Sequence, residues 1–288
     1  MTGASLAAAW RTLFLFVSAP VVGAALMALI GRLTGARWPA AERPLGWLPW
    51  AAGGAALLGA AQLASPPPAH LALWLHPVAV GLRGAAVLAA LWWAMRQVAR
   101  HPSTTPAAVT LAIYAMLVTP IATDWLLGGV PGHSVSAAGM MLACQQITAA
   151  CALPLALGTG GERERQDLAR LMVAGALGLG YLLFMDYLIV WFGNLPAHVG
   201  FYVARDAGLA PAVIVAAMLL GWGAPVVLLA RGDEWGRRWA GGAALAALLL
   251  IDGWWVGLDV LAAGLVLLAL VVAGAGWWFG GREATVHG

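Results

Sequence analysis

The chain has 288 residues, of which 62% are hydrophobic and only 9% are charged. A water-soluble domain cannot bury that much apolar surface, so the composition excludes a soluble protein and predicts a polytopic membrane protein. The net charge of +3 does not indicate a nucleic-acid partner, because the basic residues lie in the loops that flank the apolar stretches.

Apolar stretches of about 20 residues, long enough to cross a hydrocarbon core of about 30 Å, recur along the whole chain. We therefore predict an all-α transmembrane helix bundle that forms a single domain over 1–288, with about nine spans and a range of eight to ten. In chain order, the spans are expected near 12–31, 45–64, 79–98, 107–127, 134–157, 168–191, 208–230, 239–256 and 260–280. The number of spans is least well defined in 240–280, because this stretch is longer than one span needs and short for two spans with a loop between them.

All 15 basic residues are arginines, and their distribution tests this span count. With nine spans, only Arg11, Arg83 and Arg205 fall on one side of the membrane. The other side receives Arg32, Arg37, Arg43, Arg96, Arg100, Arg163, Arg165, Arg170, Arg231, Arg237, Arg238 and Arg282. Because arginine is enriched in cytoplasmic loops, we predict a periplasmic N-terminus and a cytoplasmic C-terminus in a bacterial inner membrane. The first apolar stretch lacks a signal-peptide cleavage pattern and is expected to be a true span.

The histidines are predicted to lie in loops or at span ends, where they cannot serve as the facing axial ligands of a b-type haem. They are His70, His76, His101, His133, His198 and His287. No cluster of histidine, cysteine and acidic residues has metal-ligand spacing, and no phosphate-binding or dinucleotide fingerprint is present. We therefore expect no metal and no haem in this chain.

Four acidic residues fall inside or at the edge of predicted spans, all in the outer half of the membrane. They are Asp124, Asp186, Asp252 and Asp259. Gln145 and Gln146 lie near the middle of a neighbouring span. Ionisable groups in a membrane are costly and usually face a bundle interior, a water file or a counter-ion. Two interpretations stay open: the acids pair with Arg83 or Arg205 to hold helices together, or they line a proton-conducting or quinol-facing path.

Two motifs place polar residues and tryptophans at span ends. The first is formed by Asp124, Trp125, Pro131, Ser136 and Gly139. The second, within 181–205, has the form Trp-x-x-Asn-x-Pro…Tyr-x-x-Arg and is formed by Trp191, Asn194, Pro196, Tyr202 and Arg205. Tyr202 and Arg205 are three residues apart, so they are expected to share a helical face.

Both motifs resemble the second large membrane subunit of alternative complex III, the quinol:cytochrome c oxidoreductase of many bacteria. Two weaker matches, 33–38 and Arg83, occur in the family's order, and the resemblance covers residues from about 30 to 260. This subunit is itself similar to the polysulfide-reductase/NrfD-like membrane proteins. Those proteins are helix bundles without cofactors that dock against a periplasmic iron–sulfur subunit, and the resemblance implies the same fold here.

The chain departs from the family's pattern at outer-side positions. Val130 replaces a glutamate, and His133 lies in a Gly-His-Ser triplet where the family has His-Trp-Tyr. His198 replaces a second glutamate, and Asp186 replaces a glutamine. These changes alter the titratable groups on the side of the membrane where the family's partner subunit docks.

The resemblance implies a cofactor-free integral subunit of a quinol-oxidising respiratory complex that supports proton movement or a quinone-type pocket on the periplasmic side. Its implied partners are membrane lipid, a periplasmic iron–sulfur subunit, a second NrfD-like membrane subunit and a c-type cytochrome subunit. Haem and iron–sulfur clusters would belong to those partners, and this chain is not expected to be catalytic alone. The alternatives are a purely structural anchor or assembly subunit of the same complex and, less favoured because no repeat is visible, a solute transporter.

The candidates for a proton path or quinone pocket are therefore the four outer-half acids and the two glutamines, namely Asp124, Asp186, Asp252, Asp259, Gln145 and Gln146. Arg83 and Arg205 are the expected counter-ions of the acids. The pocket and the loop that meets the partner are expected to comprise Trp125, His133, Trp191, Asn194, Pro196, His198 and Tyr202.

Overall fold

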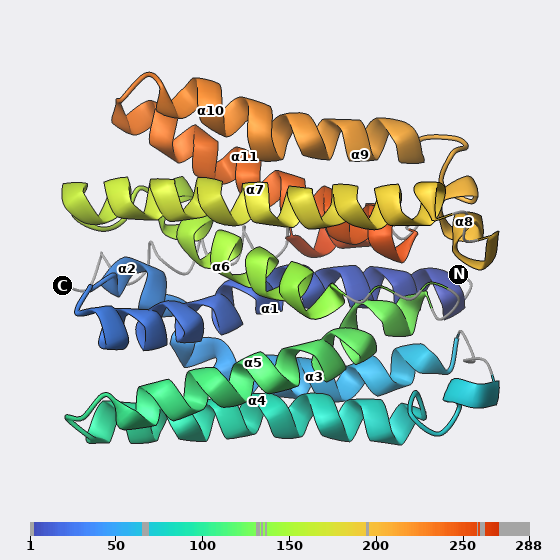
Figure 1. Cartoon of the computed structure of the whole chain (residues 1–288), viewed down its shortest axis with the longest axis horizontal. Helices are drawn as coiled ribbons and strands as arrows, with labels where there is room; N and C mark the ends of the chain where they lie inside the picture. Colours follow the sequence, from blue (N-terminus) through green and yellow to red (C-terminus); the bar gives the residue numbers. More distant parts are fainter. Residues whose placement is uncertain are drawn as a thin grey trace.

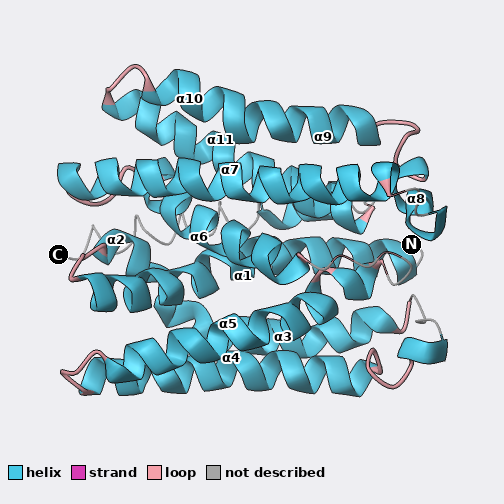
Figure 2. Cartoon of the chain, viewed as in Figure 1, coloured by secondary structure: helices cyan, strands magenta, loops and turns pink. Residues whose placement is uncertain are grey.

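The computed structural model of the chain describes residues 3–64, 69–130, 133, 135, 137–193, 196–257, 259 and 263–270. Within these residues the regular structure is helical, with no strand (Figure 2), which confirms the predicted all-α bundle. The long helices are α1 (Gly3–Thr34), α4 (Pro77–Arg100), α5 (Thr105–Trp125), α6 (Ala138–Ala156), α7 (Glu162–Phe192) and α11 (Glu234–Val256). The shorter helices are α2 (Pro39–Glu42), α3 (Leu48–Gln62), α8 (Pro196–Val203), α9 (Ala210–Met218) and α10 (Ala224–Leu229).

Seven helical segments in the described part are long and apolar enough to cross a membrane. Six are the long helices, and the seventh is Ala210–Leu229, in which a π-helical turn over Leu219–Gly223 joins α9 to α10. By length and composition the chain is thus a multi-pass membrane protein. These seven correspond to seven of the nine predicted spans.

The two remaining predicted spans fall on 45–64 and 260–280. The first coincides with a 3₁₀ turn, Arg43–Trp47, followed by α3, whose 15 residues are fewer than the roughly 20 that cross a bilayer. Pro44 and Pro49 lie at the starts of these two elements, because proline lacks the N–H that a continuous helix needs. Most of 260–280 lies outside the described residues, of which 263–270 is helical. The count of nine stays a prediction.

Helices α1 and α6 form the centre of the bundle (Figure 1). In their most apolar stretches, 67% of the residues of α1 and 72% of those of α6 are buried, against 17% in α5. Helix α5, on the flank, therefore presents a broad apolar face outward. Helices α3, α4 and α5 lie on one side of this centre, and α7, α9, α10 and α11 lie on the other (Figure 1). Small residues permit the close packing, since a methyl group at Gly23 would overlap the backbone of Gln146.

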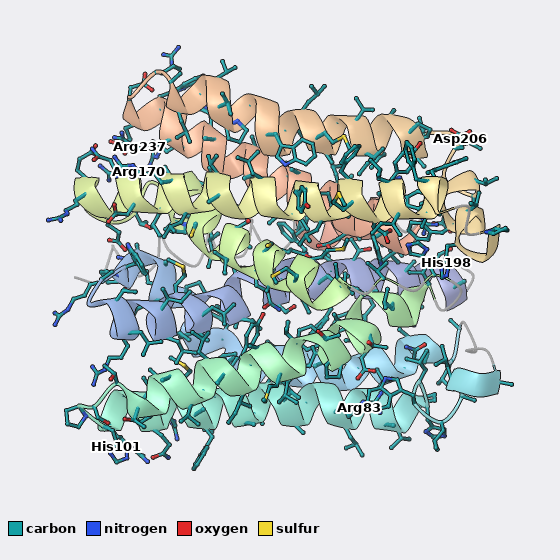
Figure 3. The ribbon with its side chains drawn as sticks, in the orientation of Figure 1. Arg83, His101, Arg170, His198, Asp206 and Arg237 are labelled. Carbon is teal, nitrogen blue, oxygen red and sulfur yellow. The ribbon has the colours of Figure 1, made fainter. Side chains whose placement is uncertain are left out.

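The predicted segregation of the arginines is visible along the bundle. Figure 3 shows Arg170 and Arg237 at one end, and Arg83 and His198 toward the opposite end. This grouping matches the sides assigned from the sequence, although which end faces the cytoplasm stays a prediction. We use the term outer end for the end that carries α8 and His198.

Candidate functional site at the outer end of the bundle

The carboxylate of Asp186, in the outer half of α7, is shared by two side chains from separate segments. The hydroxyl of Tyr202, on α8, lies 2.5 Å from Oδ2, and Nε2 of His133 lies 3.0 Å from the same oxygen. His133 and Asp186 are buried, at 3% and 7% exposure. The fold therefore places one imidazole and one phenol around a single oxygen of a buried carboxylate.

Aromatic side chains hold His133 in place. Its ring stacks on Phe201 with centroids 4.1 Å apart and an interplanar angle of 11°, and Trp255 and His198 approach it edge-on or obliquely at 5.8 Å. Its Nδ1 is buried and has no hydrogen-bond partner among the described residues. The imidazole is thus held by one hydrogen bond at Nε2 and by aromatic contacts on its ring.

Arg205 is not the counter-ion of Asp186, contrary to the prediction. Its guanidinium donates to the carbonyl oxygens of Trp254 at 2.9 Å, Trp255 at 2.7 Å and Phe201 at 3.0 Å. The first two carbonyls belong to the last turn of α11, where helix carbonyls lack intrahelical donors and a cation is favourable. Burial lowers the pKa of Arg205 to about 10, so the group stays charged at neutral pH. Arg205 therefore ties the segment after α8 to the end of α11.

Of the two predicted counter-ions, Arg83 pairs with Asp124. Nε and Nη2 of Arg83 donate to the two carboxylate oxygens at 2.8 and 2.7 Å, and Nη2 also donates to the carbonyl of Trp74 at 2.6 Å. The Asp124 side chain is 4% exposed and that of Arg83 is 32% exposed. This bidentate pair joins the outer parts of α4 and α5, on the opposite side of the α1–α6 centre from Asp186.

The two adjacent glutamines of α6 make separate polar contacts. Gln145 Nε2 donates to both carboxylate oxygens of Asp252 on α11, at 2.7 and 2.9 Å. Gln146 Oε1 accepts from the hydroxyl of Tyr114 on α5 at 2.5 Å. Ser5 Oγ donates to Asp259 at 2.6 Å. No hydrogen bond between described residues links the Gln145–Asp252 contact to the Gln146–Tyr114 contact, or either of them to Asp186.

A cavity of about 700 Å³ lies beside Asp186, between α7, α8, α9 and α11. Its aromatic lining comes from Phe184, Tyr187, Trp191, Tyr202 and Trp254. The Nε1 donor of Trp254 is buried and has no hydrogen-bond partner within the described part. The rest of the wall is aliphatic apart from Arg205 and Asp206. A volume of this size, lined by apolar and aromatic side chains with a small number of polar groups, is typical of small-ligand and cofactor sites.

The two tryptophans predicted to wall one pocket line two different cavities. Trp191 lines the outer-end cavity described above. Trp125 lines a second cavity, on the other side of the α1–α6 centre. The sequence could not separate them, because each lies at the outer end of an apolar helix and belongs to a motif of polar and aromatic residues.

The predicted partner loop is only partly described. Pro196 begins α8 and is exposed, and His198 lies in the same helix at the outer end (Figure 3). Asn194 lies outside the described residues. Sequence reasoning missed Tyr187 and Trp254, because each stands in an apolar run where an aromatic residue reads as ordinary packing.

No known protein family and no characterised protein sequence matches this chain. Within the described residues, no group of three or more histidine, cysteine and acidic side chains is arranged to hold a metal ion. The fold and the site together define a multi-pass α-helical membrane protein with an aromatic cavity beside a buried carboxylate. Membership of the resembled family stays a prediction.

Proposed function

We propose that this chain is an integral membrane subunit of a quinol-oxidising respiratory complex, and that the outer-end cavity binds a quinone-type ligand. The observation that carries the proposal is that Tyr202 both lines the cavity and hydrogen-bonds to the buried Asp186. A quinone head is a flat, largely apolar ring with two carbonyl oxygens. Aromatic walls suit the ring, and the unpartnered Nε1 of Trp254 offers a donor to one oxygen.

The geometry also suits proton transfer from a quinol. Oxidation of a quinol releases two electrons and two protons, and the electrons would pass to an iron–sulfur or haem centre of a partner subunit. Burial and the hydrogen bond to Asp186 raise the pKa of Tyr202, so its phenol stays protonated at neutral pH. Tyr202 therefore acts as a relay: its oxygen accepts a quinol proton while its own proton moves to Asp186. His133, 3.0 Å from the same carboxylate oxygen, is the next acceptor.

The sequence resemblance supports the same class of protein. Trp191 and Tyr202, two positions of the Trp-x-x-Asn-x-Pro…Tyr-x-x-Arg motif, both line the cavity. Helix α8 covers part of the outer end (Figure 1), where a periplasmic iron–sulfur subunit would dock. The remaining proposed partners are a second NrfD-like membrane subunit and a c-type cytochrome subunit, in a bacterial inner membrane with the N-terminus outside.

A structural anchor or assembly subunit of the same complex is the second candidate. It is favoured by two contacts of buried carboxylates, Asp124 with Arg83 and Asp252 with Gln145, each of which joins two different helices. On this alternative, quinol chemistry belongs wholly to a partner, and no quinone binds beside Trp191.

Binding of a quinone to the purified full-length chain distinguishes the two candidates. We expect saturable binding of a tritiated short-chain ubiquinone analogue in a scintillation proximity assay. The Trp254→Phe variant keeps the aromatic wall but lacks the indole donor, so its affinity should fall about 5- to 10-fold, the effect of one hydrogen bond. Trp239→Phe, near the opposite end of the same helix, is the matched control and should bind as the wild type does. Absence of saturable binding would leave the anchor role.

A further inference from the structure

The residues that line the second cavity extend along most of α5. The cavity has a volume of about 410 Å³ and lies between α1, α4, α5 and α6. Its lining along α5 runs from Thr110 to Trp125, the last residue of that helix. Fifteen residues at 1.5 Å each give about 22 Å along the helix axis, which exceeds half of a hydrocarbon core of about 30 Å. An extended chain fits this length better than a compact ring does.

The outer part of this cavity carries an unsatisfied hydrogen-bond donor. Trp125 is 2% exposed, and its Nε1 is buried with no hydrogen-bond partner among the described residues. A buried donor without an acceptor is unfavourable. An ester carbonyl at the head of an acyl chain would satisfy it.

The cationic side chain of Arg83 lies near the outer end of the same cavity. Arg83 lies three and four residues before Ala86 and Val87, which line the cavity, so all three share one face of α4. Its Nε and Nη2 are bonded to Asp124 and to the backbone at Trp74, whereas Nη1 makes no hydrogen bond within the described part. The side chain is 32% exposed, and Figure 3 shows it on α4 at the outer half of the bundle. A guanidinium edge at this position favours a phosphate.

We propose that this cavity binds one membrane phospholipid, with an acyl chain along α5, an ester carbonyl at Trp125 and the phosphate at Arg83. The phosphate contact is what favours a phospholipid over an isoprenoid quinone, which carries no phosphate. The bound chain fills the space between α4–α5 and the α1–α6 centre. The site is separate from the outer-end cavity, so the proposal stands independently of the proposed function.

Native mass spectrometry of the full chain tests the proposal. The protein, delipidated in mild detergent, is titrated with a phosphatidylglycerol, with the diacylglycerol of the same chains, and with an isoprenoid ubiquinone. We expect one retained phosphatidylglycerol per chain and at least about 10-fold weaker retention of the diacylglycerol, which lacks the phosphate. We also expect no displacement of the phospholipid by the quinone.

Matched variants locate the bound lipid. Ala90 lines the cavity, and the neighbouring Ala89 is exposed on another part of α4 and is not among the lining residues. Ala90→Phe should abolish retention, whereas Ala89→Phe should leave it unchanged. Trp125→Phe, which keeps an aromatic ring against Phe14, should weaken retention about 5- to 10-fold. Equal retention by Ala90→Phe and the wild type, equal retention of the diacylglycerol, or displacement by the quinone would each overturn the proposal.

Discussion

Replacing Asp186 by asparagine is expected to lower quinol oxidation by the assembled complex about 100-fold or more, while the chain still folds. Asparagine keeps a carbonyl oxygen where the Tyr202 hydroxyl bonds to the carboxylate, so the local packing survives. The amide, however, cannot accept the proton that the tyrosine passes on. The measurement is the steady-state rate of quinol oxidation together with the number of protons released per quinol.

Asp206→Asn provides the matched control for this prediction. Asp206 lines the outer-end cavity, but it is exposed and makes no hydrogen bond to Tyr202 within the described part (Figure 3). Its substitution should change the rate less than twofold, about the range that surface changes produce. Wild-type rates in a correctly folded Asp186→Asn variant would remove Asp186 from the proton path and leave it a structural role.

Loss of Arg83 is expected to produce the largest loss of stability among the polar contacts. Arg83→Leu leaves Asp124 buried without its cation, and breaking a buried ion pair typically costs about 3–5 kcal/mol. Because Arg83 is 32% exposed, solvent screens part of the interaction, and we expect about 2–3 kcal/mol here. Equilibrium unfolding in mixed detergent micelles gives the change in the free energy of unfolding.

The double variant Arg83→Leu/Asp124→Leu separates the pair from its neighbours. Removing both charges eliminates the unpaired carboxylate, so the double variant should be more stable than Arg83→Leu alone, with a coupling energy of about 1–2 kcal/mol. Additive effects of the two single changes would show that the pair contributes nothing beyond its separate side chains.

Composition and arginine placement were sufficient to predict the helical bundle and the grouping of charges at its two ends. Helix α3 differs from the predicted span because Pro44 and Pro49 divide an apolar stretch whose composition alone reads as continuous. The pairing of Arg83 with Asp124 was predictable because both are charged groups at the outer parts of neighbouring spans. Ionisable groups in a membrane often pair with one another.

The environment of Asp186 could not be predicted in the same way. Its two contacts come from His133 and Tyr202, which are 53 and 16 positions away in the sequence. Their arrangement depends on how α8 folds back on α7 and on the loop before α6. Two carbonyls in the last turn of α11 instead accept hydrogen bonds from Arg205, which also donates to the carbonyl of Phe201 on α8. Whether Arg205 binds the Asp186 carboxylate or the carbonyls at the end of α11 depends on the tertiary structure, and the spacing of these residues in the sequence does not determine it.

The most direct test of the central claim, that a quinone binds beside Tyr202, is photocrosslinking with an azido-quinone, followed by peptide mapping of the full chain in the membrane. The outer-end cavity predicts labelling of the peptides that carry Tyr187, Trp191 and Tyr202, with excess unlabelled quinone suppressing it. Labelling that is confined to α4 and α5, or that excess quinone does not reduce, would contradict a quinone site at the outer end of α7.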